Sequence, residues 1–218
     1  MKVMVAAIAA LALLAGCGGG GNDADSSDEQ PAAATPNFVQ PGAPGEPSRT
    51  LTPEEAAKIE TTPVTEADVQ FMQDMIHHHT QAIEMTGWVP SRASSRGVKL
   101  IAQRMARSQE AEIEVMERWL QEHGAEPPSD HSSHGGKLMP GMLTEEQMDR
   151  LEDGDGRQFD RLFLRYMTQH HRGALQMVSE LRESGGGLQS EIDKLAREIA
   201  TDQEIEIQRM KDLLAEVA

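Results

Sequence analysis

The chain has 218 residues, with 20 Lys and Arg against 36 Asp and Glu, which gives a formal net charge of −16 at pH 7. No basic stripe is visible, so the composition argues against nucleic-acid binding and against an electrostatic contact with anionic lipid. The acidic balance would instead draw cations toward the surface.

The N-terminus has the pattern of an export signal. A basic residue at position 2 precedes an apolar run over residues 3–14, which is shorter than the roughly 20 residues that span a membrane. The run ends in Leu14-Ala15-Gly16-Cys17, which resembles the lipobox of bacterial lipoproteins. We expect residues 1–16 to be a lipoprotein signal peptide and Cys17 to be acylated, which would anchor the protein to a membrane outside the cytoplasm. The alternative is an ordinary signal peptide followed by an incidental cysteine.

The next segment, residues 17–52, is rich in Gly, Asp, Ser, Pro and Ala and almost lacks apolar side chains. Such a segment cannot bury enough surface to offset its ordering entropy, so we expect a disordered linker. Acylation would consume the only cysteine, so any soft-metal chemistry must use Met and His. The remaining residues, 53–218, suit one domain by length.

The first half of that domain predicts two helices. Thr65 and Asp68 form a capping box that opens a helix from residue 66. Its periodic pattern runs to about residue 88, and Pro90 is expected to stop it. A second helix is expected over about 98–123, where Gly124 closes it as a C-terminal cap.

The second half predicts a polar loop and three helices. The loop covers about residues 126–141, and a short helix near residue 151 follows, opened by a capping box of Thr144 and Gln147. A long helix is expected from about 157 to 184, where a run of three glycines breaks it. The last helix reaches nearly to the C-terminus.

The two halves repeat each other. Residues 71–79 align without a gap with residues 163–171, and the Gln-Glu-x-Glu-Ile segment at 109–113 recurs at 203–207. Two long helices per repeat give four in all, which predicts an all-α fold, an antiparallel bundle built from two repeated helical hairpins. The repeats cover about residues 66–123 and 157–217.

Histidines and methionines lie on the core-facing stripes of these helices, as a turn of about 100° per residue places them. Thioethers are good ligands for Cu(I), and imidazole suits Cu and Zn. Packing alone does not require a His pair in two equivalent places, so the pattern predicts one metal site in each repeat. The candidates are Met75, His78, His79, Met85, Glu112 and Met116 in the first repeat, and Met167, His170, His171, Met177, Glu206 and Met210 in the second.

Each repeat is expected to bind Cu(I) through its own methionines and one histidine, while the other histidine bonds Glu112 or Glu206. Binding is expected to weaken as the pH falls through about 6.5, because a coordinating imidazole must be neutral. The alternative is a packing role, in which methionines fill the core and a Glu–His hydrogen bond satisfies both polar groups without metal.

These motifs resemble the domain of unknown function 305 family, over roughly residues 66–218. The resemblance implies a ferritin-like four-helix bundle, often exported, with some relatives linked to copper or silver binding and resistance. Carried over, the matching positions are the two His–Met motifs. The segments that carry it are Met75-x-x-His78-His79-x-x-Ala82-x-x-Met85, its copy from Met167 to Met177, Gln-x-x-Glu-Ile-x-x-Met at 109–116 and 203–210, and the runs 139–143 and 159–163.

The polar loop contains a second candidate metal site. His131, His134, Met139 and Met142 offer the same donor types on an irregular segment, where they would pick up or hand over Cu(I). The alternative is a solvated loop, because no regular spacing constrains these residues.

Three function classes remain open. The leading one is a metal-binding protein with no enzymatic activity, a membrane-anchored extracytoplasmic binder of Cu(I) or Ag(I) that sequesters or delivers the ion in metal tolerance. The second is a di-iron or di-manganese enzyme, but its Glu-x-x-His motif is absent: Asp74 precedes His77 by three, and its repeat partner is Tyr166. The third is a structural envelope protein without metal. The expected partners are the membrane and the metal ion.

Overall fold

The computed structural model describes residues 38–41, 45–56, 62–128 and 138–217. The chain divides into two units, Met1–Ile59 and Glu60–Ala218. The predicted signal peptide, the lipidation candidate Cys17 and the loop candidates His131 and His134 lie outside the described residues. No helix in the described ranges is long and apolar enough to cross a membrane.

The described part of the first unit contains a short antiparallel ribbon. Strand β1 (Phe38–Gln40) pairs with β2 (Arg49–Leu51), and the helical turn α1 (Pro53–Ala56) follows. The disordered linker expected over residues 17–52 therefore does not hold for these residues. Composition averaged over the segment hid the β-branched pair Val39 and Thr50, which face each other across the strands.

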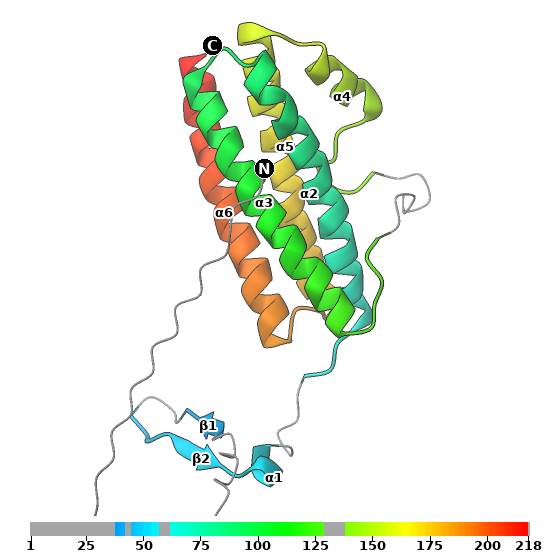
Figure 1. The fold of residues 1–218 in the computed structure, drawn as a ribbon, viewed down its shortest axis with the longest axis vertical. Helices are drawn as coiled ribbons and strands as arrows, with labels where there is room; N and C mark the ends of the chain where they lie inside the picture. The colour runs from blue at the N-terminus through cyan, green and yellow to red at the C-terminus, as the bar shows by residue number, and fades with distance from the viewer. Residues whose placement is uncertain (1–37, 42–44, 57–61, 129–137, 218) are drawn as a thin grey trace, which may run out of the picture. The chain divides into compact units, whose positions relative to one another are not determined.

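The second unit is built from four long helices that pack side by side (Figure 1). Helix α2 packs along α3, α5 packs along α6, and α2 and α5 pack against each other. The described chain is mostly helical, as the sequence predicted. The helices are α2 (Glu66–Arg92), α3 (Arg96–Glu122), α4 (Glu145–Glu152), α5 (Gly156–Glu183) and α6 (Ser190–Glu216).

Local sequence explains most of the helix ends. Both predicted capping boxes are present, at Thr65 before α2 and at Thr144 before α4. Gly124 follows α3 with φ of 68°, the left-handed conformation that glycine adopts without strain. Pro90 does not stop α2, which continues to Arg92. The proline lies in the last turn, so its missing N–H removes only a single bond near the end of the helix.

Two buried carboxylates accept hydrogen bonds from the turns at the ends of the bundle. Asp68 in α2 accepts a hydrogen bond from the backbone N–H of Gly187, 2.6 Å away in the turn before α6. Asp160 in α5 accepts bonds from the backbone N–H groups of Ser94 (3.1 Å) and Ser95 (2.9 Å), in the turn before α3. The start of α2 is therefore held beside the end of α5, and the start of α5 beside the end of α2. The two helices run antiparallel.

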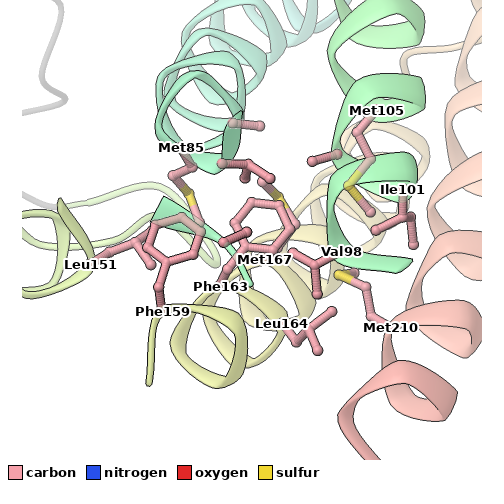
Figure 2. Close-up of a cluster of buried hydrophobic side chains, with 14 of the residues drawn as sticks. Met85, Val98, Ile101, Met105, Leu151, Phe159, Phe163, Leu164, Met167 and Met210 are labelled. Carbon is pink, nitrogen blue, oxygen red and sulfur yellow. The ribbon is translucent and has the colours of Figure 1, made fainter. Parts of the chain in front are cut away.

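The apolar core consists of two clusters that the histidines separate along α2 and α5. The first core cluster, shown in part in Figure 2, includes Ala82, Met85, Met105, Phe159, Phe163, Met167 and Met210. The second core cluster includes Met72, Met75, Met116, Ala174, Met177 and Ile199. On α2 the histidines fall between Ile76 and Ala82, and on α5 between Met167 and Ala174.

Candidate metal centre in the bundle core

Four histidines from the two central helices lie in the core. His78 and His79 come from α2, His170 and His171 from α5, and each is at most 1% exposed. The rings of His78 and His170 stack across the helix interface, with centroids 3.8 Å apart and planes at 35°. We call these four residues the histidine group.

Two members of the group bond carboxylates on the outer helices. His79 Nε2 lies 2.6 Å from Glu112 Oε2 of α3, and His171 Nε2 lies 2.7 Å from Glu206 Oε2 of α6. When the carboxylate is ionised it can only accept, so Nε2 then carries the hydrogen and the lone pair stays on Nδ1. Neither Nδ1 has a hydrogen-bond partner. A carboxylate that orients an imidazole in this way is the usual support for a metal-binding histidine.

The other two histidines also have free ring nitrogens. His78 Nε2 donates to the backbone carbonyl of Pro140 at 3.0 Å, so its Nδ1 likewise keeps a lone pair without a partner. His170 has no partner at either nitrogen. All four Nδ1 atoms are thus buried and unpaired, and an unsatisfied buried polar group costs about 1–3 kcal/mol.

Burial lowers the pKa of three of these imidazoles, those of His78, His170 and His171, and keeps them neutral well below pH 7. Desolvation, helped by the neighbouring His79, lowers the pKa of His78 to about 3. Desolvation also lowers the pKa of His171 to about 3 and that of His170 well below its usual value. The prediction that metal binding weakens as the pH falls through about 6.5 used the ordinary pKa of imidazole, and burial gives these three candidate ligands lower pKa values.

A carboxylate cluster lies on the solvent side of the His–Glu pairs. Burial and the nearby Glu112 raise the pKa of Glu206 to about 7. Burial, together with Glu112 and Glu206, also raises the pKa of Asp202. Glu112, Glu198 and Asp202 line a groove of about 670 Å³ between α3 and α6. Arg118 and Lys194 also line this groove, so acidic and basic side chains both lie along it.

The segment at 138–143 covers the histidine group. Gly173 of α5 allows it to approach, because a Cβ there would lie 2.0 Å from the Pro140 carbonyl oxygen. Gln81 of α2 fixes the segment through two bonds with the backbone of Leu143, at 2.8 and 3.0 Å. Gln81 and Gly173 occupy equivalent positions in the two repeats, so one repeat binds the segment and the other leaves space for it.

The loop candidates on this segment are only partly buried. Met139 packs against the second core cluster, and Met142, three residues later in the chain, is half-buried. Since His131 and His134 are outside the described residues, the predicted four-residue loop site stays a prediction.

The six candidate methionines are buried but do not group by repeat. Met75, Met116 and Met177 belong to the second core cluster, and Met85, Met167 and Met210 to the first. The expectation that Met75 and Met85 share one ion is wrong, because ten residues of helix separate them by about 15 Å. Antiparallel packing of α2 and α5 instead brings methionines of opposite halves together.

The His–Glu bonds fix which methionines face each other. Because α2 and α3 run antiparallel with His79 opposite Glu112, Met75 (four residues before His79) and Met116 (four after Glu112) lie at the same level. By the same argument from His171 and Glu206, Met167 lies level with Met210. We call these the two methionine pairs; the histidine group lies between them.

Two buried glutamines are functional candidates that the sequence analysis missed. Gln109 of α3 and Gln203 of α6 are each 2% exposed. Both side-chain polar atoms of Gln109 and Oε1 of Gln203 lack a hydrogen-bond partner. Their signal in the sequence is that the same residue type recurs at equivalent positions of the two repeats, three residues before Glu112 and Glu206.

The donor set consists of nitrogen and sulfur. In the described part of the chain, no three His, Cys, Asp or Glu side chains are placed together to hold a metal ion. Around the histidine group the donors are unpaired imidazole nitrogens and thioethers, and this combination suits Cu(I) or another soft ion. The orphaned Nδ1 atoms are chemically suited to such an ion.

The fold and core define a mostly helical protein with unpaired imidazoles among buried thioethers. Comparison with known families identifies the family to which it belongs. The model of the family described as domain of unknown function (DUF305) matches residues 68–214. The chain belongs to the DUF305 family. No protein with a curated description matches it significantly in sequence.

Three solved structures illustrate the relationship. A DUF305 protein of Streptomyces coelicolor is 35% identical, with a TM-score of 0.62, over 69% of this chain and 92% of that one. A DUF305 fragment of Deinococcus radiodurans is 32% identical, with a TM-score of 0.64, over 71% and 99%. CopM in its Cu(I)-bound form is 31% identical, with a TM-score of 0.58, over 68% and 96%. CopM has also been solved in Cu(II)-bound and Ag-bound forms.

Proposed function

We propose that this protein binds Cu(I) or Ag(I) in its bundle core and sequesters or delivers the ion in metal tolerance. The observation that carries the proposal is the set of four buried Nδ1 atoms without partners, located between two methionine pairs. A core evolved only for packing would gain stability by replacing such groups, because each one costs about 1–3 kcal/mol. Binding of Cu(I), Cu(II) and Ag by the relative CopM supports the choice of ion.

Two ions are proposed, one at each end of the histidine group. One lies between Met75 and Met116 and the other between Met167 and Met210, and each takes Nδ1 atoms from the histidines that face it. Met177 and Met85 belong to the same clusters from the opposite helix. Each proposed site therefore draws ligands from both halves of the chain.

The neighbouring residues position the ligands. Glu112 and Glu206 hold the Nε2 atoms of His79 and His171, which leaves each buried Nδ1 available to an ion. The Pro140 carbonyl does the same for His78. When bound, a soft ion would satisfy the orphaned nitrogens, and the buried environment would keep water and oxidants away from it.

The cellular setting is proposed from the sequence. Acylation at Cys17 would tether the helical unit to the outer face of a membrane by way of the linker, in the compartment where exported copper proteins act. A similar DUF305 protein from Streptomyces coelicolor is described as a secreted protein. We also propose that the four helices form a ferritin-like bundle of two repeated hairpins, a fold in which core side chains of facing helices often hold metal.

A competition titration against a colorimetric Cu(I) chelator tests this function. Wild type should take up two ions, and the variants Met75→Leu/Met116→Leu and Met167→Leu/Met210→Leu should each lose one, because Leu conserves volume but has no donor atom. Met72→Leu is the matched control: Met72 is buried in the second core cluster, and its repeat equivalent is already Leu164. Equal stoichiometry and affinity in all four proteins would show that the methionines only fill the core.

A further inference from the structure

The two buried glutamines take no part in the His–Glu bonds. Gln109 is almost completely enclosed and makes no side-chain hydrogen bond at either Nε2 or Oε1. Gln203 is equally enclosed and its Oε1 is unpaired. The same residue type at equivalent positions of the two halves has the same defect, although each unpaired atom costs about 1–3 kcal/mol. An oxygen without a partner in both halves indicates that a ligand satisfies it.

The printed contacts place each glutamine along the bundle axis. Gln203 lies three residues before Glu206, so it is level with Ala174, three residues after His171 on the antiparallel helix α5. Ala174 belongs to the second core cluster, with Met75 and Met116. Gln203 is therefore level with the methionine pair of the first repeat.

The other glutamine has the reciprocal position. Gln109 lies three residues before Glu112, so it is level with Ala82, three residues after His79. Ala82 belongs to the first core cluster, with Met167 and Met210. Each glutamine thus lies level with the methionine pair of the opposite half. The residue level with it on the neighbouring helix, Ala174 or Ala82, has a small side chain.

We infer that Gln109 and Gln203 are oxygen ligands that allow the core to hold Cu(II) as well as Cu(I). This inference rests on the proposed copper function. Thioethers stabilise Cu(I), whereas Cu(II) prefers nitrogen and oxygen donors in a tetragonal arrangement. A neutral carboxamide oxygen next to imidazole nitrogens supplies that set without adding a buried charge, which a carboxylate at the same position would do. The same cavity then has a donor set for each oxidation state.

The test replaces the oxygen by sulfur at nearly constant volume. In Gln109→Met/Gln203→Met, Cu(II) affinity measured against a chromophoric Cu(II) chelator should fall about tenfold or more, and the Cu(II) electron paramagnetic resonance spectrum should change. Cu(I) affinity should be unchanged or higher. Gln109→Glu/Gln203→Glu keeps the oxygen and should keep Cu(II) binding. Gln103→Met, an exposed position on α3, is the matched control and should behave as wild type in both titrations.

The outcomes separate this inference from the proposed function. In one outcome, wild type binds Cu(I), and Gln109→Met/Gln203→Met has the same Cu(II) affinity and spectrum as wild type. This result overturns the oxygen-ligand role and leaves the Cu(I) function intact. Wild type that binds Cu(I) and no Cu(II) does the same. Wild type that binds no Cu(I) overturns the proposed function itself.

Discussion

Replacing His170 by leucine should make the metal-free protein more stable. His170 is 1% exposed and both of its ring nitrogens are unpaired, at about 1–3 kcal/mol for each. Leucine fills a similar volume and has no polar atom, but the substitution gives up the ring contact with His78, worth about 0.5–1.5 kcal/mol. The net expectation is a gain of about 0.5–5.5 kcal/mol, or about 1–22 °C in Tm for a domain of this size.

The assay is thermal and urea unfolding of chelator-treated protein at pH 7, followed by circular dichroism, with a parallel Cu(I) titration. His170→Leu should unfold later than wild type when metal-free and bind Cu(I) more weakly. The control is His79→Leu, which strands the Glu112 carboxylate and should lower stability by about 1–3 kcal/mol. If His170→Leu destabilises the metal-free protein as much as His79→Leu does, then His170 has a packing role and the reasoning from unpaired nitrogens is refuted.

Three further outcomes are expected. Between pH 7 and 5 the unfolded chain gains protons on His78, His170 and His171 that the folded protein excludes, whereas the raised pKa of Glu206 acts in the opposite direction. Three histidines outweigh one glutamate, so the urea midpoint should fall from pH 7 to pH 5, and an unchanged or higher midpoint would contradict the burial of the neutral imidazoles. Gly173→Ala should push the Pro140 segment away and lower Tm. The control Gly87→Ala, with nothing within 4 Å of the added Cβ, should raise Tm slightly. Equal Tm changes in the two variants would contradict the close contact at Gly173. Asp160→Ala should destabilise by about 1–3 kcal/mol in urea, because it leaves two backbone N–H groups of the α2–α3 turn unpaired.

Helical periodicity was sufficient to predict the long helices and much of the site. The stripe on α2 and α3 placed His79 and Glu112 on facing surfaces, and the structure joins them at 2.6 Å. Capping boxes read from three-residue spacings appear at Thr65 and Thr144. These features depend on contacts within one helix or between helices joined by a short turn, so local sequence determines them.

Features that depend on distant segments were not accessible in the same way. The Pro140 carbonyl reaches His78 across 62 residues, and no spacing rule gives that contact. The grouping of Met177 with Met75 and Met116 depends on how α2 lies against α5, and the contacts at the ends of these two helices join residues far apart in the sequence. The low pKa of His78 follows from burial, and a sequence pattern does not measure burial. The grouping of Met75 with Met85, in contrast, was open to correction from helix geometry alone.

The most direct test of the central claim is the position of a soft ion in a crystal of the tag-free helical unit loaded with Ag(I). Anomalous scattering from silver would locate the ions without reference to the side chains. The account predicts two peaks inside the core, one at Met75 and Met116 and one at Met167 and Met210, each contacted by Nδ1 atoms of the histidine group. Silver bound only at surface residues, with the histidine group and both methionine pairs unligated, would contradict it.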